Sequence, residues 1–219
     1  MIQESIKKLF EVDQTKIPEN IPLFPLDNIL LLPFGKLPLN IFEERYIKMT
    51  LDSLKSHRMI GIIQPKNNNN DLFMMGCIGK ITSYIETPDY RIVLNLEGVC
   101  RFELQERDLH PHGYYQAKID INDFTDDLKT YEPQFDRESL IKKYFNFFKM
   151  KKLEIDKNAL SETSNLQLLS TLAMLAPFNK IDKQAILESP SIMARHNTIN
   201  SILDLNTFQV VNKNTNQLN

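Results

Sequence analysis

The first segment whose residues could do chemistry is a glycine-lysine stretch, GCIGKI, at residues 76–81. A phosphate-binding P-loop needs four residues between its glycines and a Ser or Thr after the lysine, because the backbone wraps the phosphates and the hydroxyl holds Mg²⁺. Here two residues separate the glycines, and Ile81 follows Lys80. We therefore interpret Gly76 and Gly79 as strand positions at a bulge or a close backbone approach, and we expect no nucleotide site.

A second candidate is the pair of imidazoles at His110 and His112, which flank Pro111. A zinc site takes three or four ligands at recognisable spacing, and neither Cys77 nor Cys100 belongs to a CxxC pair. We favour a surface histidine pair over a metal site. Cys100 falls on the apolar phase of an alternating segment and is interpreted as a core residue. The sequence thus predicts no metal and no cofactor.

Nucleophile motifs are also missing, since the sequence contains neither GxSxG nor HExxH. The acid pairs at residues 43–44 and 126–127 are common features of helix starts and loops. We predict no catalytic residue. An enzyme whose groups the fold assembles from distant positions stays open as an alternative, and a pocket with perturbed titratable groups would favour it.

Hydrophobic periodicity indicates the elements that hold these residues. Apolar segments punctuated by proline predict short strands, with the prolines at ends, edges or bulges, over residues 21–26, 28–33 and 37–42. Helical spacing predicts helices over residues 2–10 and 43–56. From 59 to 122 the period returns to two, with a turn at 87–90. Clean alternation favours a mainly antiparallel sheet, and one early helix among the strands suggests a small mixed β-barrel.

The C-terminal part changes to helical patterns. Asp136, Ser164 and Asn179 are candidate N-caps, and Pro190 is expected to open the last helix. We predict an α+β fold in four parts: an N-terminal helical extension (1–17), a barrel subdomain (18–130), a helical subdomain (131–208) and a flexible tail (209–219).

Composition narrows the classes of function. The 219 residues carry 26 Lys and Arg against 28 Asp and Glu, for a net charge of −2. Proteins that coat phosphate backbones usually have a basic excess, and the basic cluster at 149–152 suits a helix C-terminus. No apolar run approaches a membrane span, early charges argue against a signal peptide, and two cysteines suit a reducing compartment. We therefore expect a cytoplasmic protein with no membrane segment.

The order of several motifs resembles a known family. The stretches IPLFPL (21–26), LLPFG (31–35) and LPLNIFEERY (37–46) look like the opening of the LON N-terminal, substrate-binding domain. The stretches MGCIGKI (75–81), LNLEGVCRF (94–102), LAM (172–174), PF (177–178) and KQAILE (183–188) resemble later parts, as in small bacterial stand-alone members. The resemblance runs from about residue 18 to about residue 205. It implies a PUA-like β-barrel followed by a helical bundle.

The resemblance also implies a role. In the complete ATP-dependent Lon protease, this module precedes an ATPase and a Ser–Lys peptidase domain, for which 219 residues without a Walker A motif leave no room. We therefore expect a non-enzymatic protein that recognises polypeptide segments or adapts them to a protease or chaperone. One alternative is an RNA-binding PUA-like module. Another is a hydrolase-associated protein that shares Lon homology without the ATPase and peptidase domains. The oligomeric state is left open.

Five residues are candidates for contacting a polypeptide partner: Phe34, Glu44, Arg45, Lys48 and Tyr114. Phe34 lies in a loop between apolar segments, where an exposed recognition residue and a plug over the barrel end are equally good interpretations. Glu44, Arg45 and Lys48 lie off the apolar stripe of the predicted helix, so a merely solvated face is the competing interpretation. The alternation places Tyr115 toward the core and Tyr114 toward solvent.

Overall fold

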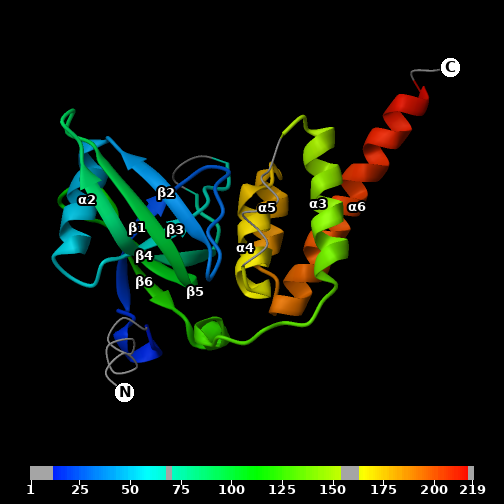
Figure 1. Ribbon diagram of the computed structural model, residues 1–219. Coiled ribbons are helices and arrows are strands. Elements are labelled where there is room, and N and C mark those ends of the chain that lie inside the picture. Colours follow the sequence, from blue (N-terminus) through cyan, green and yellow to red (C-terminus); the bar gives the residue numbers. More distant parts are fainter. Residues whose placement is uncertain (1–11, 68–70, 154–162, 217–219) are drawn as a thin grey trace. The chain divides into compact units, whose positions relative to one another are not determined.

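The computed structural model describes residues 12–67, 71–153 and 163–216, and the chain divides into two compact units. The first unit combines the residues up to Asp27 with Leu31–Thr130, and the second combines Asn28–Leu30 with the residues from Tyr131 onward. The first unit is built mainly of strands and the second of helices (Figure 1). The helix predicted over residues 2–10 lies outside the described residues.

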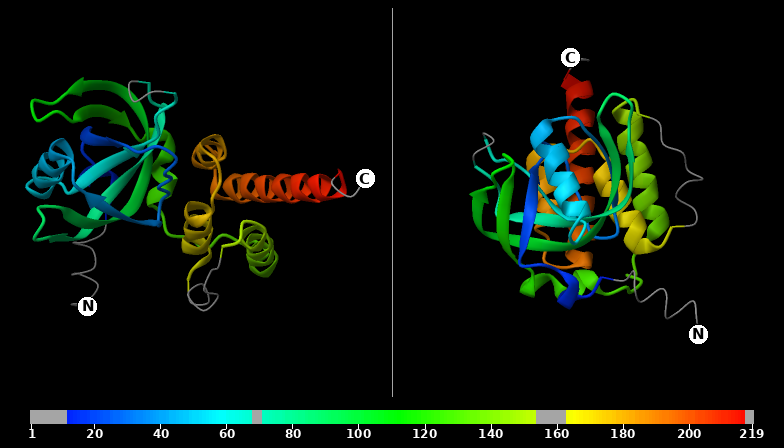
Figure 2. Two further views of the ribbon diagram at one scale, coloured as in Figure 1. Left: turned by 90° about the horizontal axis from the view of Figure 1, so that it is seen from above. Right: turned by 90° about the vertical axis from the view of Figure 1, so that its left-hand side faces the viewer.

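The elements of the first unit follow one another in the order η1 (Gln14–Lys16), β1 (Asn20–Pro25), β2 (Lys36–Ile41), α2 (Glu44–Leu54), β3 (Met59–Ile63), β4 (Met75–Glu86), β5 (Ile92–Leu109), β6 (Tyr115–Asp120) and η2 (Asn122–Leu128). The predicted turn closes the β4–β5 hairpin, where the Tyr90 amide donates to the Thr87 carbonyl at 3.0 Å. Helix α2 lies at one end of the strand layer and contacts β1 and β3 (Figure 2).

The six strands form one sheet in the order β2-β5-β4-β3-β1-β6, and β6 also pairs with β5. The long strand β5 makes this closure possible, because residues 92–97 pair with β2 while residues 103–109 pair with β6. A register shift between Leu104 and Glu106 interrupts the ladder with β6. Strands β1 and β3 are parallel and the other pairs are antiparallel. The predicted mixed β-barrel is confirmed.

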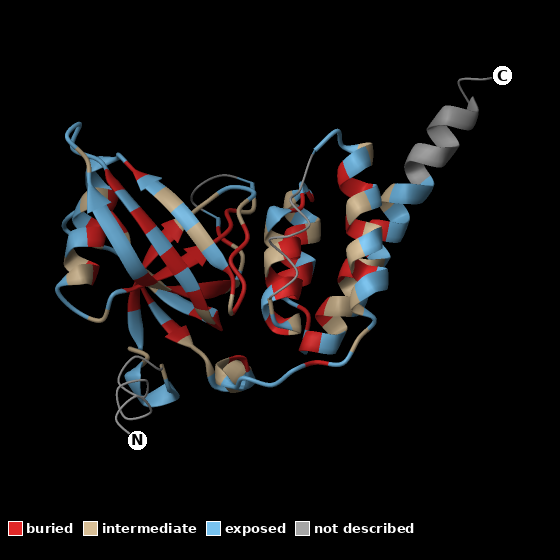
Figure 3. Ribbon diagram, in the orientation of Figure 1, coloured by how far each residue is buried: buried red, intermediate tan, exposed pale blue. Residues whose placement is uncertain are grey.

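The inward-facing side chains fill the barrel, as the buried positions along its strands show (Figure 3). The buried cluster consists of Ile21, Leu23, Met59, Ile63, Leu72, Ile78, Phe102, Leu104, Ala117 and Ile119. Gly76 and Gly79 lie within β4, as predicted. A Cβ on Gly76 would lie 2.4 Å from Cζ of Phe102, so the absent side chain makes room for this ring.

Residues 28–33 differ from the prediction, because they form no strand. Leu31 and Leu32 are nevertheless buried, and a Cβ on Gly98 would lie only 1.9 Å from the Leu32 carbonyl oxygen. The apolar run is therefore a core-packing segment of irregular backbone that crosses β5 closely. Its leucines are buried without ladder hydrogen bonds. The strand prediction was wrong because it relied on apolar content alone.

A buried ion pair attaches η2 to the barrel. Arg101 donates to Asp127 through Nε at 2.7 Å and through Nη2 at 3.1 Å, and the Arg101 amide donates to the same carboxylate at 3.1 Å. Nearby, the Cys100 thiol donates to the Phe124 carbonyl, and burial raises the pKa of this thiol. Cys100 is thus a core residue, as predicted.

The second unit contains α3 (Arg137–Met150), α4 (Asn165–Leu175), α5 (Lys180–Leu187) and α6 (Ile192–Asn216). The three predicted N-caps are confirmed, because the side chains of Asp136, Ser164 and Asn179 each accept a backbone hydrogen bond at the start of α3, α4 and α5. Helix α6 begins after Ser191, whose Oγ accepts from the Ala194 amide at 3.1 Å, and not at Pro190. The helix continues to Asn216, past the predicted start of the tail at residue 209.

Aromatic and aliphatic side chains form the core of the second unit. Phe147 and Phe178 have ring centroids 5.2 Å apart, and Tyr144 is buried beside them. Lys183 is also buried, and its ammonium donates to the Asn28 carbonyl at 2.7 Å, which holds the Asn28–Leu30 segment within this unit. Burial lowers the pKa of Lys183. Of the helices described, none combines the length and the apolar character needed to cross a membrane.

Candidate functional site

Helix α2 presents three of the five predicted contact residues to solvent. Glu44, Arg45 and Lys48 are all exposed. Lys48 Nζ lies 2.7 Å from Glu44 Oε1, and this hydrogen-bonded pair holds the pKa of Glu44 below its usual value. Arg45 donates through Nε and Nη2 to Glu43 Oε2 at 3.1 and 2.8 Å. The predicted solvated face is confirmed, and its charges are paired with one another.

Phe34 occupies a tight turn next to β5 and has a φ of +65°, which is uncommon for a residue with a side chain. The Phe34 amide donates to the Gly98 carbonyl at 2.9 Å, and the Gly98 amide donates to the Gly35 carbonyl at 2.8 Å. Phe34 is half-buried, so it is neither a fully exposed recognition residue nor a fully buried plug over the barrel end. It lines a groove of about 1080 Å³ with charges of both signs, including Arg58, Lys80 and Glu97.

Tyr114 corrects the prediction, because its side chain is buried (4% exposed) and Tyr115 is half-buried. Tyr114 precedes the first residue of β6, so the strand alternation does not govern it. Its ring stacks on His110 with centroids 4.3 Å apart, and its hydroxyl donates to Asp52 Oδ2 at 3.1 Å. Burial and the Asp52 charge raise the pKa of Tyr114 to about 12. Tyr114 therefore supports its neighbours and is not an exposed contact.

Asp52 joins α2 to the β5–β6 connection. His112 Nδ1 lies 2.7 Å from Asp52 Oδ2, the oxygen that also accepts from Tyr114. Burial opposes ionisation of Asp52, but the hydrogen bonds from His112 and Tyr114 outweigh it and hold the pKa of Asp52 below its usual value. Asp52 was not predicted as a partner of the histidine pair, because 60 residues separate it from His112.

An apolar surface that was not predicted from the sequence lies at the outer face of the sheet. We call it the outer apolar patch, and it consists of Phe42, Ile85 and Val93. Their exposed fractions are 65%, 67% and 39%. Ile85 lies opposite Val93 in the β4–β5 ladder, so both side chains leave the same face of the sheet. The Arg91 guanidinium lies 5.9 Å from the Phe42 ring centroid and pairs with Asp89 at 2.8 Å.

A signal for this patch was present in the sequence. Val93 alternates with the buried residues Ile92 and Leu94, so an apolar residue stands at a solvent-facing phase. Ile85 lies in the last part of β4, where residues 82–86 are all exposed. Three exposed apolar side chains with a charged neighbour resemble the core and rim of a protein-binding surface.

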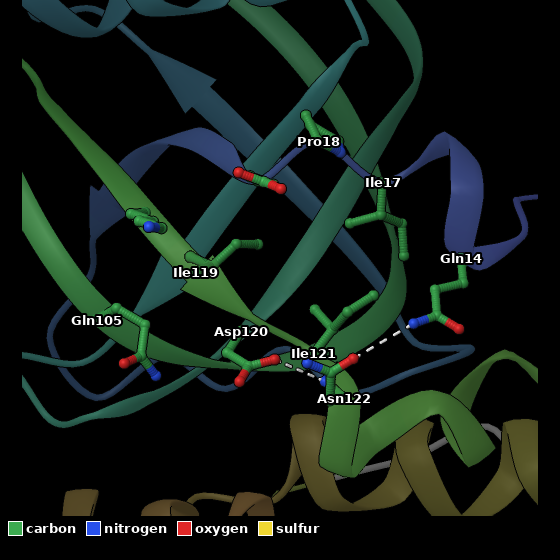
Figure 4. A pocket seen from close by; sticks show the side chains of 10 residues that line it. Gln14, Ile17, Pro18, Gln105, Ile119, Asp120, Ile121 and Asn122 are labelled. Carbon is green, nitrogen blue, oxygen red and sulfur yellow. Dashed lines mark hydrogen bonds between the residues drawn. The ribbon is translucent and has the colours of Figure 1, made fainter.

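A smaller pocket of about 500 Å³ lies beside β6 (Figure 4). Gln14 approaches Asn122 at 3.5 Å, while the Asn122 amide donates to Asp120 at 2.9 Å. The residues that line it include carboxylates, amides and one lysine, Lys118, but no Ser, Cys or His. Its lining therefore lacks the hydroxyl, thiol and imidazole groups from which Ser–His and Cys–His catalytic pairs are built.

The comparisons with known proteins point to one family. The family model described as "ATP-dependent protease La (LON) substrate-binding domain" matches residues 20–204. The "Lon protease" of Dictyoglomus thermophilum is 26% identical over 95% of this chain and 27% of that protein. The "Lon protease" of Cytophaga hutchinsonii is 24% identical over 89% of this chain and 25% of that protein. The chain thus spans about a quarter of the length of these curated relatives.

Solved structures with the same fold include a "Lon N-terminal domain protein" from Xanthomonas campestris. That structure matches 84% of this chain and 97% of its own, with a TM-score of 0.59 and 19% identity. The "N terminal domain of Mycobacterium avium complex Lon protease" matches 86% of this chain and 98% of its own, with a TM-score of 0.55 and 11% identity. These similarities establish the fold, a mixed barrel followed by helices.

Proposed function

Because this chain belongs to the family of ATP-dependent protease La (LON) substrate-binding domains, we propose that it binds polypeptide segments through the outer apolar patch. The observation that carries the proposal is the exposure of three neighbouring apolar residues: Ile85 and Val93 leave one face of the sheet, and Phe42 directly follows β2. Unfolded or flexible segments expose apolar side chains that folded proteins bury. Contact with the patch removes both apolar surfaces from water.

The charges near the patch suit a polar rim. Phe42 directly precedes α2, which carries the exposed Glu44, Arg45 and Lys48. We propose that these side chains contact polar groups of the bound segment, with affinity coming mainly from the apolar centre. Tyr114 has no place in this proposal, because its side chain is buried.

The exposed edge of the sheet favours binding through side chains over the addition of a strand by the partner. Strand β2 pairs with β5 alone, so its other edge has no strand partner within the six-stranded sheet. Pro38 lies in the middle of this edge strand and carries no backbone N–H. A proline and the exposed Lys36 are features that oppose strand addition at an edge.

We further propose that this chain contributes binding without catalysis and presents the bound segment to a protease or chaperone partner. Both cysteines are buried, and burial keeps the Cys100 thiol protonated. The family match supports substrate binding, and the adaptor role extends it.

Fluorescence anisotropy with a labelled, permanently unfolded polypeptide such as reduced β-casein tests the proposal. We expect saturable binding that Ile85→Ser and Phe42→Ser each weaken, because each removes apolar surface from the contact. Leu109→Ser is a matched control, because Leu109 is also 67% exposed at the end of a strand but lies outside the patch. Wild-type binding by both patch variants, or equal losses in the control, would contradict the proposal.

A parallel titration with structured RNA at low salt examines the alternative function. The groove beside Phe34 carries Glu97 and Asp127 as well as Lys80 and Lys129, so it lacks the excess of cations that phosphate binding needs. We expect no salt-dependent RNA complex. Tight RNA binding that falls steeply with salt would favour the RNA-binding function over polypeptide binding.

A further inference from the structure

Three side chains with metal-binding atoms meet where α2 approaches the β5–β6 connection. Asp52, His110 and His112 each offer one ligand atom, and these atoms all lie within 4.8 Å of one another. All three belong to the first unit. His112 is exposed, while Asp52 and His110 are partly buried. The cluster is thus open to an ion from solvent.

The backbone of the connection holds the two imidazoles in place. The His110 amide donates to the Tyr114 carbonyl at 2.8 Å, and the Gly113 amide donates to the His110 carbonyl at 2.8 Å. Gly113 has a φ of +86°, a conformation that side chains disfavour. The ring centroids of His110 and His112 consequently lie 4.9 Å apart.

Tyr114 supports this cluster from the protein interior. Its buried ring stacks on His110, and its hydroxyl donates to Asp52 Oδ2. One buried side chain therefore orients one imidazole and the carboxylate together. Such neighbouring groups fix the orientation of ligands in metal sites.

We propose that Asp52, His110 and His112 bind a divalent transition-metal ion of the Zn²⁺ class, with further coordination positions open to solvent. Two imidazoles and one carboxylate form a ligand set that suits Zn²⁺, whereas Ca²⁺ and Mg²⁺ prefer oxygen ligands. No third ligand lies near the histidine pair along the chain, and Asp52 of α2 supplies one in the folded structure.

The closest pair of ligand atoms needs only a small rearrangement to bind an ion. Asp52 Oδ2 and His112 Nδ1 are 2.7 Å apart, a hydrogen-bond distance. Tetrahedral coordination at about 2.0–2.1 Å separates neighbouring ligand atoms by about 3.3 Å. An ion that replaces the shared proton moves these two atoms apart by about 0.6 Å, which the 45% exposed His112 side chain can accommodate. The ion then links α2 to the β5–β6 connection.

Isothermal titration of the chelator-treated full chain with zinc chloride tests the site. We expect one ion per chain, and we expect the zinc affinity to fall more than about tenfold in His112→Gln and in Asp52→Asn. Loss of a ligand should cost more than loss of an outer hydrogen-bond partner, which by itself lowers metal affinity about 10- to 100-fold. His196→Gln is the matched control, because this histidine lies on α6 in the second unit. Calcium and magnesium should not compete.

X-ray absorption at the zinc edge of the wild-type complex provides a measurement that does not depend on variants. We expect nitrogen and oxygen neighbours with imidazole scattering and no sulfur. Absence of zinc binding, a sulfur neighbour, or wild-type affinity in both His112→Gln and Asp52→Asn would overturn the proposal. Polypeptide binding is measured separately, so failure of the metal site leaves the outer apolar patch unaffected.

Discussion

The buried pair of Arg101 and Asp127 gives a stability prediction whose size follows from its geometry. The two side chains are 4% and 5% exposed, and three donors of Arg101 lie 2.7–3.1 Å from the Asp127 carboxylate. Asp127→Ala removes the negative charge and leaves the guanidinium in an interior that disfavours an unpaired ion. Removing one partner of such a pair costs about 3–5 kcal/mol. The expected loss is a large part of a typical unfolding free energy of about 5–15 kcal/mol.

Urea unfolding of the full chain, followed by circular dichroism, measures this loss. Hydrogen exchange of β5 peptides assigns it to the first unit. Asp126→Ala is the matched control, because Asp126 pairs with Lys129 in solvent and its loss should leave the midpoint unchanged. The double variant Arg101→Met with Asp127→Leu should lose less than Asp127→Ala, because it leaves no charge unpaired. A loss below about 1 kcal/mol in Asp127→Ala, or a larger loss in the double variant, would refute this reasoning.

Three further predictions concern separate parts of the chain. Gly98→Ala places a Cβ 1.9 Å from the Leu32 carbonyl oxygen, so we expect a loss of about 1–3 kcal/mol or more in urea unfolding; an unchanged midpoint would show that the crossing segment moves freely. Ser164→Ala removes the cap of α4 and should cost about 1 kcal/mol, whereas no change would mean that water replaces the cap. Asp52 has a lowered folded pKa, so its stabilisation is present above its ordinary pKa and is lost as the pH falls through the folded value. The stability difference between wild type and Asp52→Asn should therefore shrink below about pH 4, and a difference that grows on acidification would contradict this assignment.

Local patterns in the sequence predicted the elements that depend on near neighbours. The helix starts at Asp136, Ser164 and Asn179 were identified because a cap and its backbone donor lie within three residues. The proline turn at 87–90 was identified for the same reason. The structure differs from these predictions in two segments. Residues 30–33 are buried without forming a strand, and α6 continues into the mainly polar residues 209–216, which were predicted as a tail.

The candidate sites were less accessible to sequence reasoning because they depend on contacts between distant residues. Glu44, Arg45 and Lys48 were placed correctly on a solvated face, since helical spacing decides which side of α2 they occupy. Tyr114 was assigned to solvent because strand alternation was extended one residue before β6 begins. Tyr114 belongs to the connection between β5 and β6, and its contacts with His110 and Asp52 bury it.

The sequence by itself determined the composition, the division into strand and helix patterns, the helix caps and the family resemblance. These properties arise from side-chain spacing over a few residues or from the order of motifs along the chain. The tertiary structure alone decided that β5 pairs with β2, β4 and β6, that Ile85 lies opposite Val93, and that Asp52 meets His112. Strand register and closure bring these residues together, because they depend on the packing of the whole barrel and not on local spacing.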